Sequence, residues 1–148
     1  MKSLTLTIVA LLFSIATFAQ IETPVTWSYA AKKTSATEAI VYIKATIEDG
    51  WHLYSQYMKA GGPVKTTFTF AKSPAYTLIG ATIEPKPIKK FEPTFDMEVS
   101  YFANSAIFQQ KVKLKGKTAV VKGKLEYMTC DDHQCLPPDE VSFSVTVK

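Results

Sequence analysis

The sequence of 148 residues contains no arginine, so all 17 basic side chains are lysines, against 13 acidic ones. Proteins most often read phosphates and guanine edges with arginine, because its planar guanidinium donates paired hydrogen bonds. Basic charge without such readers attracts nucleic acid only non-specifically. The formal net charge of +4 therefore indicates a solvated lysine-rich surface, and no nucleic-acid partner is expected.

Cysteine and histidine are also scarce, with two of each. Two cysteines are too few for a disulfide-rich scaffold, which a domain of this length does not need. Both lie in the segment Cys130-Asp131-Asp132-His133-Gln134-Cys135, and the second histidine is His52. Any covalent chemistry must therefore use Cys130 and Cys135, and no cofactor is expected.

The sequence has one long apolar run, and it lies at the N-terminus. Lys2 precedes a largely apolar stretch from Leu4 to Phe18, and Thr17-Phe18-Ala19 offers small residues for cleavage. This pattern predicts a signal peptide over residues 1–19 and an exported, periplasmic chain of the Gram-negative type. The run is short and interrupted by polar residues, so stable membrane insertion is not expected. Residues 20–148 are expected to form a single domain.

No long 3.6-residue period is present, whereas alternation of apolar and polar residues is strong. Turn signals such as Gly61-Gly62-Pro63 separate the alternating runs. The pattern predicts an all-β protein, an immunoglobulin-like β-sandwich of seven to nine strands with the two cysteines on a hairpin. The clearest rows are Ala39/Val41/Ile43/Ala45/Ile47, Phe108/Gln110/Val112/Leu114, Ala119/Val121/Leu125/Tyr127 and Val141/Phe143/Val145/Val147.

Residues 85–104 do not fit the strand pattern well. They hold three prolines, which remove donors from a β-ladder, and they include Phe91 and Phe95. A loop or a broken edge strand is expected here. Long loops in compact domains are often functional, but the two aromatic residues would also fit a small satellite cluster of the core.

Three interpretations of the cysteine pair compete. A structural disulfide that closes a loop of about six residues would stabilise the folded state by roughly 2 kcal/mol, against about 4.7 kcal/mol for a loop of one hundred residues. A disulfide with a purely structural role would therefore stabilise the protein more if it linked distant strands. A zinc site could combine Cys130 and Cys135 with His133 and either Asp132 or His52. Such sites, however, usually take their ligands from two short cysteine-containing segments, and this sequence has one. A redox-active dithiol needs two sulfurs close enough to bridge in an accessible turn.

Charged neighbours affect the third interpretation. Asp131 and Asp132 place negative charge beside the sulfurs and oppose formation of a thiolate, whereas protonated His133 would offset them. The sequence therefore favours a pair that exchanges slowly until a partner docks.

Two motifs carry a resemblance to a known family. The segment from Tyr127 to Pro138, with Cys130, Cys135 and Pro137-Pro138, resembles the active hairpin of the N-terminal periplasmic domain of DsbD-type thiol:disulfide interchange proteins. Asp49-Gly50-Trp51-His52-Leu53-Tyr54 looks like the family's Gly-aromatic-x-Leu-Tyr signature. The resemblance covers nearly the whole chain after residue 19 and implies an immunoglobulin-like fold.

The resemblance also implies roles for individual residues. Cys135 would form mixed disulfides with partners, and Cys130 would displace them. Phe95 would be the aromatic residue of a cap loop that shields the sulfurs, with Phe91 the second candidate. Tyr54 and Tyr127 would flank the site. The family's best-known members have five residues between the cysteines, whereas this chain has four.

The predicted function is an exported thiol–disulfide exchange module, a component of a protein-disulfide reductase system. Its expected partners are a membrane or thioredoxin-like reductant on a separate protein and oxidised periplasmic substrates. The rival interpretation is a non-catalytic β-sandwich module for binding or assembly, whose disulfide only stiffens a loop.

Overall fold

The computed structural model describes residues 22–148, and this part of the chain folds into β-strands without a helix. The predicted signal peptide lies outside the described residues. Within them, no helix is long and apolar enough to span a membrane. The prediction of an all-β sandwich that carries its cysteines on a hairpin is confirmed.

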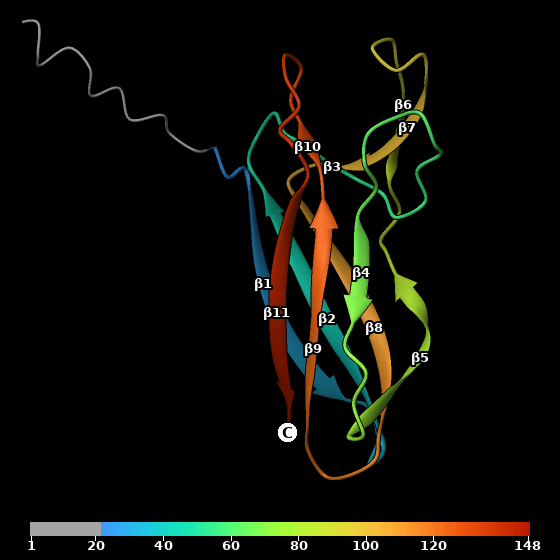
Figure 1. The fold of residues 1–148 in the computed structure, drawn as a ribbon, viewed down its shortest axis with the longest axis vertical. Helices are drawn as coiled ribbons and strands as arrows, with labels where there is room; N and C mark the ends of the chain where they lie inside the picture. The colour runs from blue at the N-terminus through green and yellow to red at the C-terminus, as the bar shows by residue number, and fades with distance from the viewer. Residues whose placement is uncertain (1–21) are drawn as a thin grey trace, which may run out of the picture.

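Eleven strands form three antiparallel sheets (Figure 1). The orders are β1-β2-β8-β5, β11-β9-β4 and β10-β3-β7-β6. The strands are β1 (Val25–Lys33), β2 (Glu38–Ile47), β3 (His52–Tyr54), β4 (Thr67–Phe70), β5 (Tyr76–Ile83), β6 (Ile88–Glu92), β7 (Met97–Phe102), β8 (Ser105–Leu114), β9 (Ala119–Tyr127), β10 (Thr129–Cys130) and β11 (Asp139–Val147).

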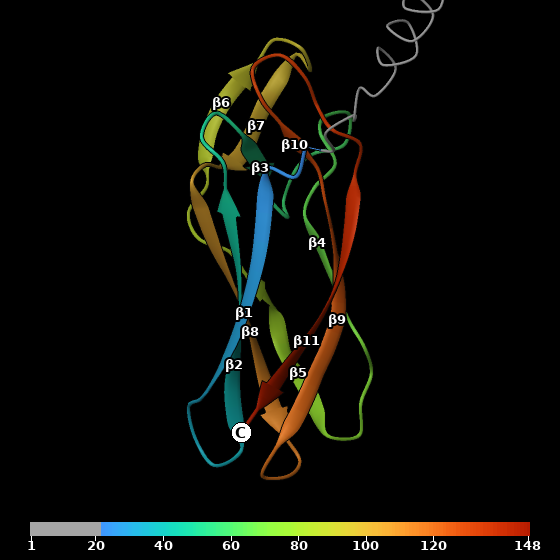
Figure 2. The same cartoon turned by 90° about the vertical axis from the view of Figure 1, so that its left-hand side faces the viewer.

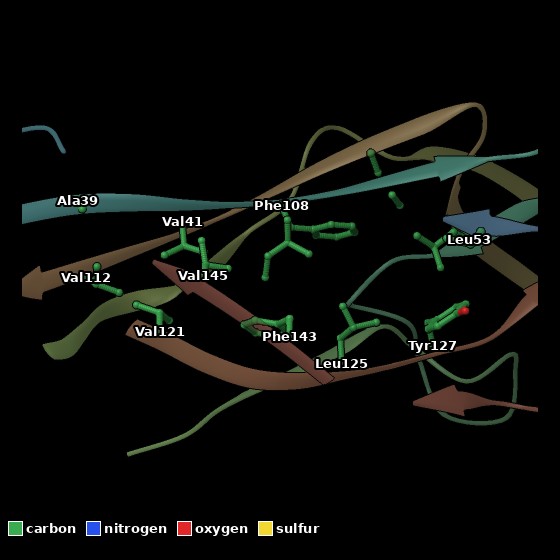
Figure 3. Close-up of a cluster of buried hydrophobic side chains, with 14 of the residues drawn as sticks. Ala39, Val41, Leu53, Phe108, Val112, Val121, Leu125, Tyr127, Phe143 and Val145 are labelled. Carbon is green, nitrogen blue, oxygen red and sulfur yellow. The ribbon is translucent and has the colours of Figure 1, made fainter. Parts of the chain in front are cut away.

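The first two sheets pack face to face and enclose the main core (Figure 3). Phe108 on β8 is fully buried, and its ring lies 4.9 Å from Phe68, 5.5 Å from Phe102 and 6.2 Å from Trp27, measured between centroids. These rings come from β4, β7 and β1, so a single side chain connects all three sheets. Aromatic pairs at such separations contribute beyond the area they bury.

The third sheet lies at one end of the sandwich (Figures 1 and 2). Each of β3, β7 and β10 follows or precedes a long strand of the sandwich in the chain. One face of this end sheet rests on the main core through Leu53 and Phe102, which are direct cross-strand partners. Because side chains alternate along a strand, the neighbouring residues of both strands must lie on the opposite, outer face.

The alternating rows expected from the sequence are confirmed as strands with their apolar members turned inward, and Ala39, Val41, Ile43, Ala45 and Ile47 are all buried. The expected count of seven to nine strands is wrong. The additional strands belong mostly to the end sheet, where β3 and β10 have three and two residues and are too short to show a period.

Strand β5 lacks an alternating pattern because a bulge interrupts it. Its register against β8 shifts between Ile79 and Ile83, and Gly80 adopts a positive φ of 69°. The amide nitrogen of buried Gln110 donates hydrogen bonds to the carbonyl oxygens of Ile79 at 3.4 Å and Gly80 at 3.2 Å. A polar residue in an otherwise apolar row thus satisfies groups that the bulge removes from the ladder.

Residues 85–104 form an ordered hairpin rather than a long loop. β6 and β7 pair in antiparallel register, and β6 is the edge strand of the end sheet. Pro85 and Pro87 precede β6, and Pro93 begins the turn, so none of the three prolines interrupts the ladder. Of the two expected forms, a loop or a broken edge strand, the structure has an edge strand, and within residues 85–104 only 85–87, 93–96 and 103–104 lie outside the strands.

Gly123 in β9 provides a test of core packing. A Cβ atom at this position would lie 2.6 Å from Cζ of Phe143 and 2.6 Å from the backbone oxygen of Thr69. The carbonyl belongs to β4 and cannot move without disturbing the ladder. Gly123→Ala is therefore expected to lower the free energy of unfolding by about 1–3 kcal/mol, as measured by denaturant unfolding.

The matched control is Gly116→Ala, because a Cβ atom there meets no heavy atom within 4 Å. Its free energy of unfolding should remain within about 0.5 kcal/mol of the parent value. Equal stability of the two variants would contradict the packing explanation.

Candidate functional site

The two cysteines form a disulfide at the tip of the hairpin between β9 and β11. They face one another as an isolated antiparallel pair. The Asp131 nitrogen donates to the Gln134 carbonyl and the Leu136 nitrogen donates to the Thr129 carbonyl, both at 2.9 Å. The four residues between the sulfurs thus form one tight turn, which brings the pair into bridging distance.

Asp131 shapes this turn through its carboxylate. Its Oδ1 atom accepts hydrogen bonds from the backbone nitrogens of His133 at 2.7 Å and Gln134 at 2.6 Å. These two bonds lower the pKa of Asp131 below its ordinary value of 3.8. Asp132 and His133 are exposed at the tip of the turn. The two acidic residues therefore differ in role, because of the two only the Asp131 carboxylate accepts hydrogen bonds from backbone amides of the turn.

The two sulfur-bearing residues differ strongly in accessibility. Cys130 is only 3% exposed, whereas Cys135 is exposed. Cys130 lies on β10 at the edge of the end sheet, while Cys135 follows the turn outside any named strand. An approaching protein can therefore contact Cys135 but not Cys130.

Cys130 belongs to a second, smaller apolar cluster on the outer face of the end sheet. Its buried members are Tyr54, Val99 and Cys130. The alternation of side chains along a strand explains this set. His52 pairs with Cys130, and Tyr54 pairs with Tyr101. All four residues lie on the face opposite to the one that Leu53 presents to the main core. The partly buried residues packed against the cluster are Met58, Phe95, Met97, Tyr101 and Met128.

Three methionines thus surround the cysteine cluster. The Ser100 nitrogen donates to Sδ of Met58 at 3.2 Å, and the Val64 nitrogen donates to Sδ of Met128 at 3.3 Å. These contacts connect the loop after β3 with β7 and with the base of the cysteine hairpin. Thioether side chains adapt their shape easily, so this surface can repack when a partner binds.

The two predicted cap residues are in different places. Phe95 lies in the turn between β6 and β7 and packs against the cluster that contains Cys130. Phe91 is 58% exposed and does not belong to that cluster. Phe91 pairs with Glu98, whereas its neighbour Lys90 pairs with Val99 of the cluster. Because side chains alternate along a strand, Phe91 lies on the face of the end sheet that is opposite to the cluster.

The two predicted flanking tyrosines also differ. Tyr54 is a buried member of the cysteine cluster, and burial, with smaller effects of Glu92 and Tyr101, raises its pKa to about 12. Tyr127 belongs to the main core, and its hydroxyl donates to Asp139 Oδ2 at 3.2 Å. From the sequence, His52 was considered only as an alternative zinc ligand and Tyr101 was not assigned to the site, although alternation from Tyr54 gives His52 the same face.

A groove lies beside the cysteine hairpin, with a volume of about 610 Å³. Its lining includes Tyr127, Leu136, Glu22 and Gln134, and Gln134 Nε2 donates to Glu22 Oε2 at 2.9 Å. Within residues 22–148, no three His, Cys, Asp or Glu side chains are arranged to hold a metal ion.

The family comparison identifies one match. The model of the family described as "Thiol:disulfide interchange protein DsbD, N-terminal" matches residues 21–147. A comparison with curated proteins finds no match.

Solved structures with the same fold share little sequence with this chain. The N-terminal domain of Neisseria meningitidis DsbD in the reduced form has a TM-score of 0.56 at 17% identity, over 84% of this chain and 86% of that one. The N-terminal periplasmic domain of ScsB from Proteus mirabilis gives 0.59 at 16% identity, over 85% and 47%. The complex of the DsbD and PilB N-terminal domains from Neisseria meningitidis gives 0.55 at 15% identity, over 84% and 87%.

The role of Asp131 leads to a pH prediction. Because hydrogen bonding lowers its pKa, the carboxylate stabilises the turn fully above pH 3.8, and this stabilisation is lost as the pH falls through the lowered pKa. Amide exchange of His133 and Gln134, measured by NMR, should therefore accelerate, after correction for intrinsic rates, only below pH 3.8. Asp131→Asn keeps an acceptor oxygen that does not titrate, so the same pH step in this variant would contradict the assignment.

Proposed function

The chain belongs to the family of DsbD N-terminal domains, and on this basis we propose that it is an exported thiol–disulfide exchange module. It would relay reducing equivalents between partner proteins by cycling Cys130 and Cys135 between dithiol and disulfide. The observation that carries this proposal is the unequal accessibility of the two cysteines, 3% for Cys130 against an exposed Cys135.

This inequality supports a proposed order of the exchange. In the reduced form, the Cys135 thiolate attacks a disulfide of the substrate, and one substrate sulfur leaves as a thiolate. Cys130 then attacks Cys135, which forms the intramolecular disulfide and releases the second substrate sulfur. The substrate gains two electrons, and a reductant restores the dithiol by the reverse sequence. The burial of Cys130 keeps it from reacting with a partner directly.

The proposed partners follow from the related structures. One of them is a complex of a DsbD N-terminal domain with a PilB N-terminal domain, and another is described as a periplasmic domain. For this chain we propose a thioredoxin-like or membrane-bound reductant, oxidised protein substrates and a periplasmic location. The groove next to the hairpin, lined by Tyr127, Thr129 and Leu136, is the surface on which a partner would lie.

A redox titration separates exchange from a purely structural disulfide. The protein is equilibrated at graded dithiothreitol ratios, alkylated, and its mass measured. A structural bond should resist reduction until below about −300 mV, whereas an exchange-active pair should titrate at a less negative potential. A pair that stays oxidised down to that limit would support the binding-module alternative.

Trapping of a partner tests the order of attack. Cys130→Ser should accumulate a covalent adduct on Cys135 that dithiothreitol releases, because the displacing thiol is absent. The measurement is non-reducing electrophoresis and mass spectrometry of a periplasmic extract. Cys135→Ser is the matched control and should yield little adduct, since Cys130 is buried. Equal trapping by both variants would contradict the assigned order.

Phe95 is proposed to shield the cysteine pair. Its ring packs against the cluster of Tyr54, Val99 and Cys130, and the turn that carries it is held by the Phe95 nitrogen donating to the Glu92 carbonyl at 3.1 Å. The hairpin tips of β6–β7 and of the cysteines project at the same end of the molecule but stand apart in Figure 1. The shield would therefore cover the Cys130 side rather than the whole disulfide.

Removal of this ring should expose the disulfide to small thiols. Phe95→Ala is expected to increase the rate of reduction by dithiothreitol severalfold, followed by quenched alkylation. Phe91→Ala is the matched control, because Phe91 lies on the other face of the same strand pair. A similar rate increase in both variants would indicate general loosening of the hairpin and would rule out shielding by Phe95.

A further inference from the structure

The second half of the proposed exchange requires a base near Cys130. The thiol of Cys130 must lose its proton before its sulfur attacks the mixed disulfide, because the thiolate is the nucleophile. Cys130 is 3% exposed and lies among Tyr54, Val99 and three methionines. Apolar surroundings disfavour a thiolate, and water has little access to remove the proton.

His52 is the titratable residue that strand pairing places opposite Cys130. The register pairs Cys130 of β10 directly with His52 of β3, and the adjacent pair is Thr129 with Leu53. Directly opposite residues of antiparallel strands project to the same face, with Cβ atoms about 4.5–5.5 Å apart. Leu53 points into the main core, so His52 and Cys130 share the outer face. An imidazole ring at that separation can reach the sulfur.

The surroundings of His52 hold the ring in place. It is half-buried, and its centroid lies 4.2 Å from that of Tyr101 on β7. Burial is the largest influence on its pKa, which is lowered from 6.5. Charged groups from each neighbouring element act in smaller measure: Asp132 and Asp131 of the cysteine hairpin and Glu92 of β6 raise the pKa, whereas Lys90 of β6 lowers it. The ring is therefore neutral at pH 7 and able to accept a proton.

We propose that His52 is the general base that activates Cys130, an inference that rests on the exchange function proposed above. A ring nitrogen of His52 takes the thiol proton, and the electron pair left on Cys130 attacks the Cys135 sulfur of the mixed disulfide. The Cys130–Cys135 bond forms, and the bond between Cys135 and the partner sulfur breaks. The partner leaves as a thiolate, to which the imidazolium returns the proton directly or through solvent.

A small disulfide tests this step without a natural partner. One equivalent of 5,5′-dithiobis(2-nitrobenzoate) reacts with the reduced protein and releases one coloured thiolate when Cys135 attacks. A second coloured thiolate is released when Cys130 attacks the mixed disulfide that the reagent has formed with Cys135. Stopped-flow absorbance separates the two, because only the first phase depends on the reagent concentration. The second phase reports the activation of Cys130 and is measured from pH 5 to pH 10.

His52→Gln is expected to slow the second phase by about 100-fold at pH 7, a typical contribution of a general base. The difference in rate between the variant and the parent protein should become smaller as the pH rises past about 8.5, the ordinary pKa of a cysteine thiol, because hydroxide then removes the proton. His52→Phe keeps a ring against Tyr101 and should show the same pH-dependent defect. His133→Gln removes the only other histidine of the sequence, which is exposed at the tip of the turn, and should slow the second phase far less than His52→Gln.

Two results would overturn the inference. One is an unchanged second phase at pH 7 in both His52 variants. The other is an equal slowing at every pH, which would mean that His52 only shapes the hairpin. Neither result depends on a natural partner, whereas the exchange function fails if the redox titration finds a locked disulfide. The two proposals can therefore fail separately.

Discussion

The contact between Phe108 and Phe102 is the packing interaction on which the site depends. Phe108 belongs to the sandwich and Phe102 to the end sheet, and their rings meet edge to face at 5.5 Å. Phe102 pairs with Leu53, so both strands present this face to the main core. A register slip of one residue would exchange the faces and bury His52 and Tyr54 in the core instead. The large apolar core therefore determines which side chains surround Cys130.

Stability and chemistry are separated between the two clusters. The main core is built from aliphatic and aromatic side chains of the two sandwich sheets and the inner face of the end sheet, and none of its members among residues 22–148 carries a sulfur atom. The cysteine cluster is small and relies on adaptable methionines. A disulfide that closes a loop this short contributes only roughly 2 kcal/mol by chain entropy. Opening it would remove only a small part of the stability of the sandwich, which agrees with the redox cycle proposed above.

The sequence was sufficient for the parts of the fold that repeat every two residues. The row from Ala39 to Ile47 predicted β2 correctly because one face of it is buried along its whole length. Within the end sheet, β3 and β10 escaped prediction because they are too short to show a period. The pattern of β5 was not recognised because Gly80 introduces a bulge. Short strands and bulges depend on pairing with residues that are distant in the sequence. A local pattern of apolar and polar residues carries no information about these partners.

The candidate site shows the same division between local and distant information. The sequence was enough to place both cysteines on a hairpin, because the turn is local, but it left a disulfide, a zinc site and a redox dithiol as alternatives, and the structure shows the disulfide. The sequence treated Asp131 and Asp132 as equal negative charges, but the amides of His133 and Gln134 partly compensate the charge of Asp131. The electrostatic opposition to a thiolate is therefore weaker than two free carboxylates would impose. From the sequence, His52 was only an alternative zinc ligand, and its position opposite Cys130, 78 residues away in the sequence, arises from the pairing of β3 with β10. The proposed exchange therefore relies on one acidic residue that holds the turn and on an imidazole that strand pairing places opposite the buried cysteine.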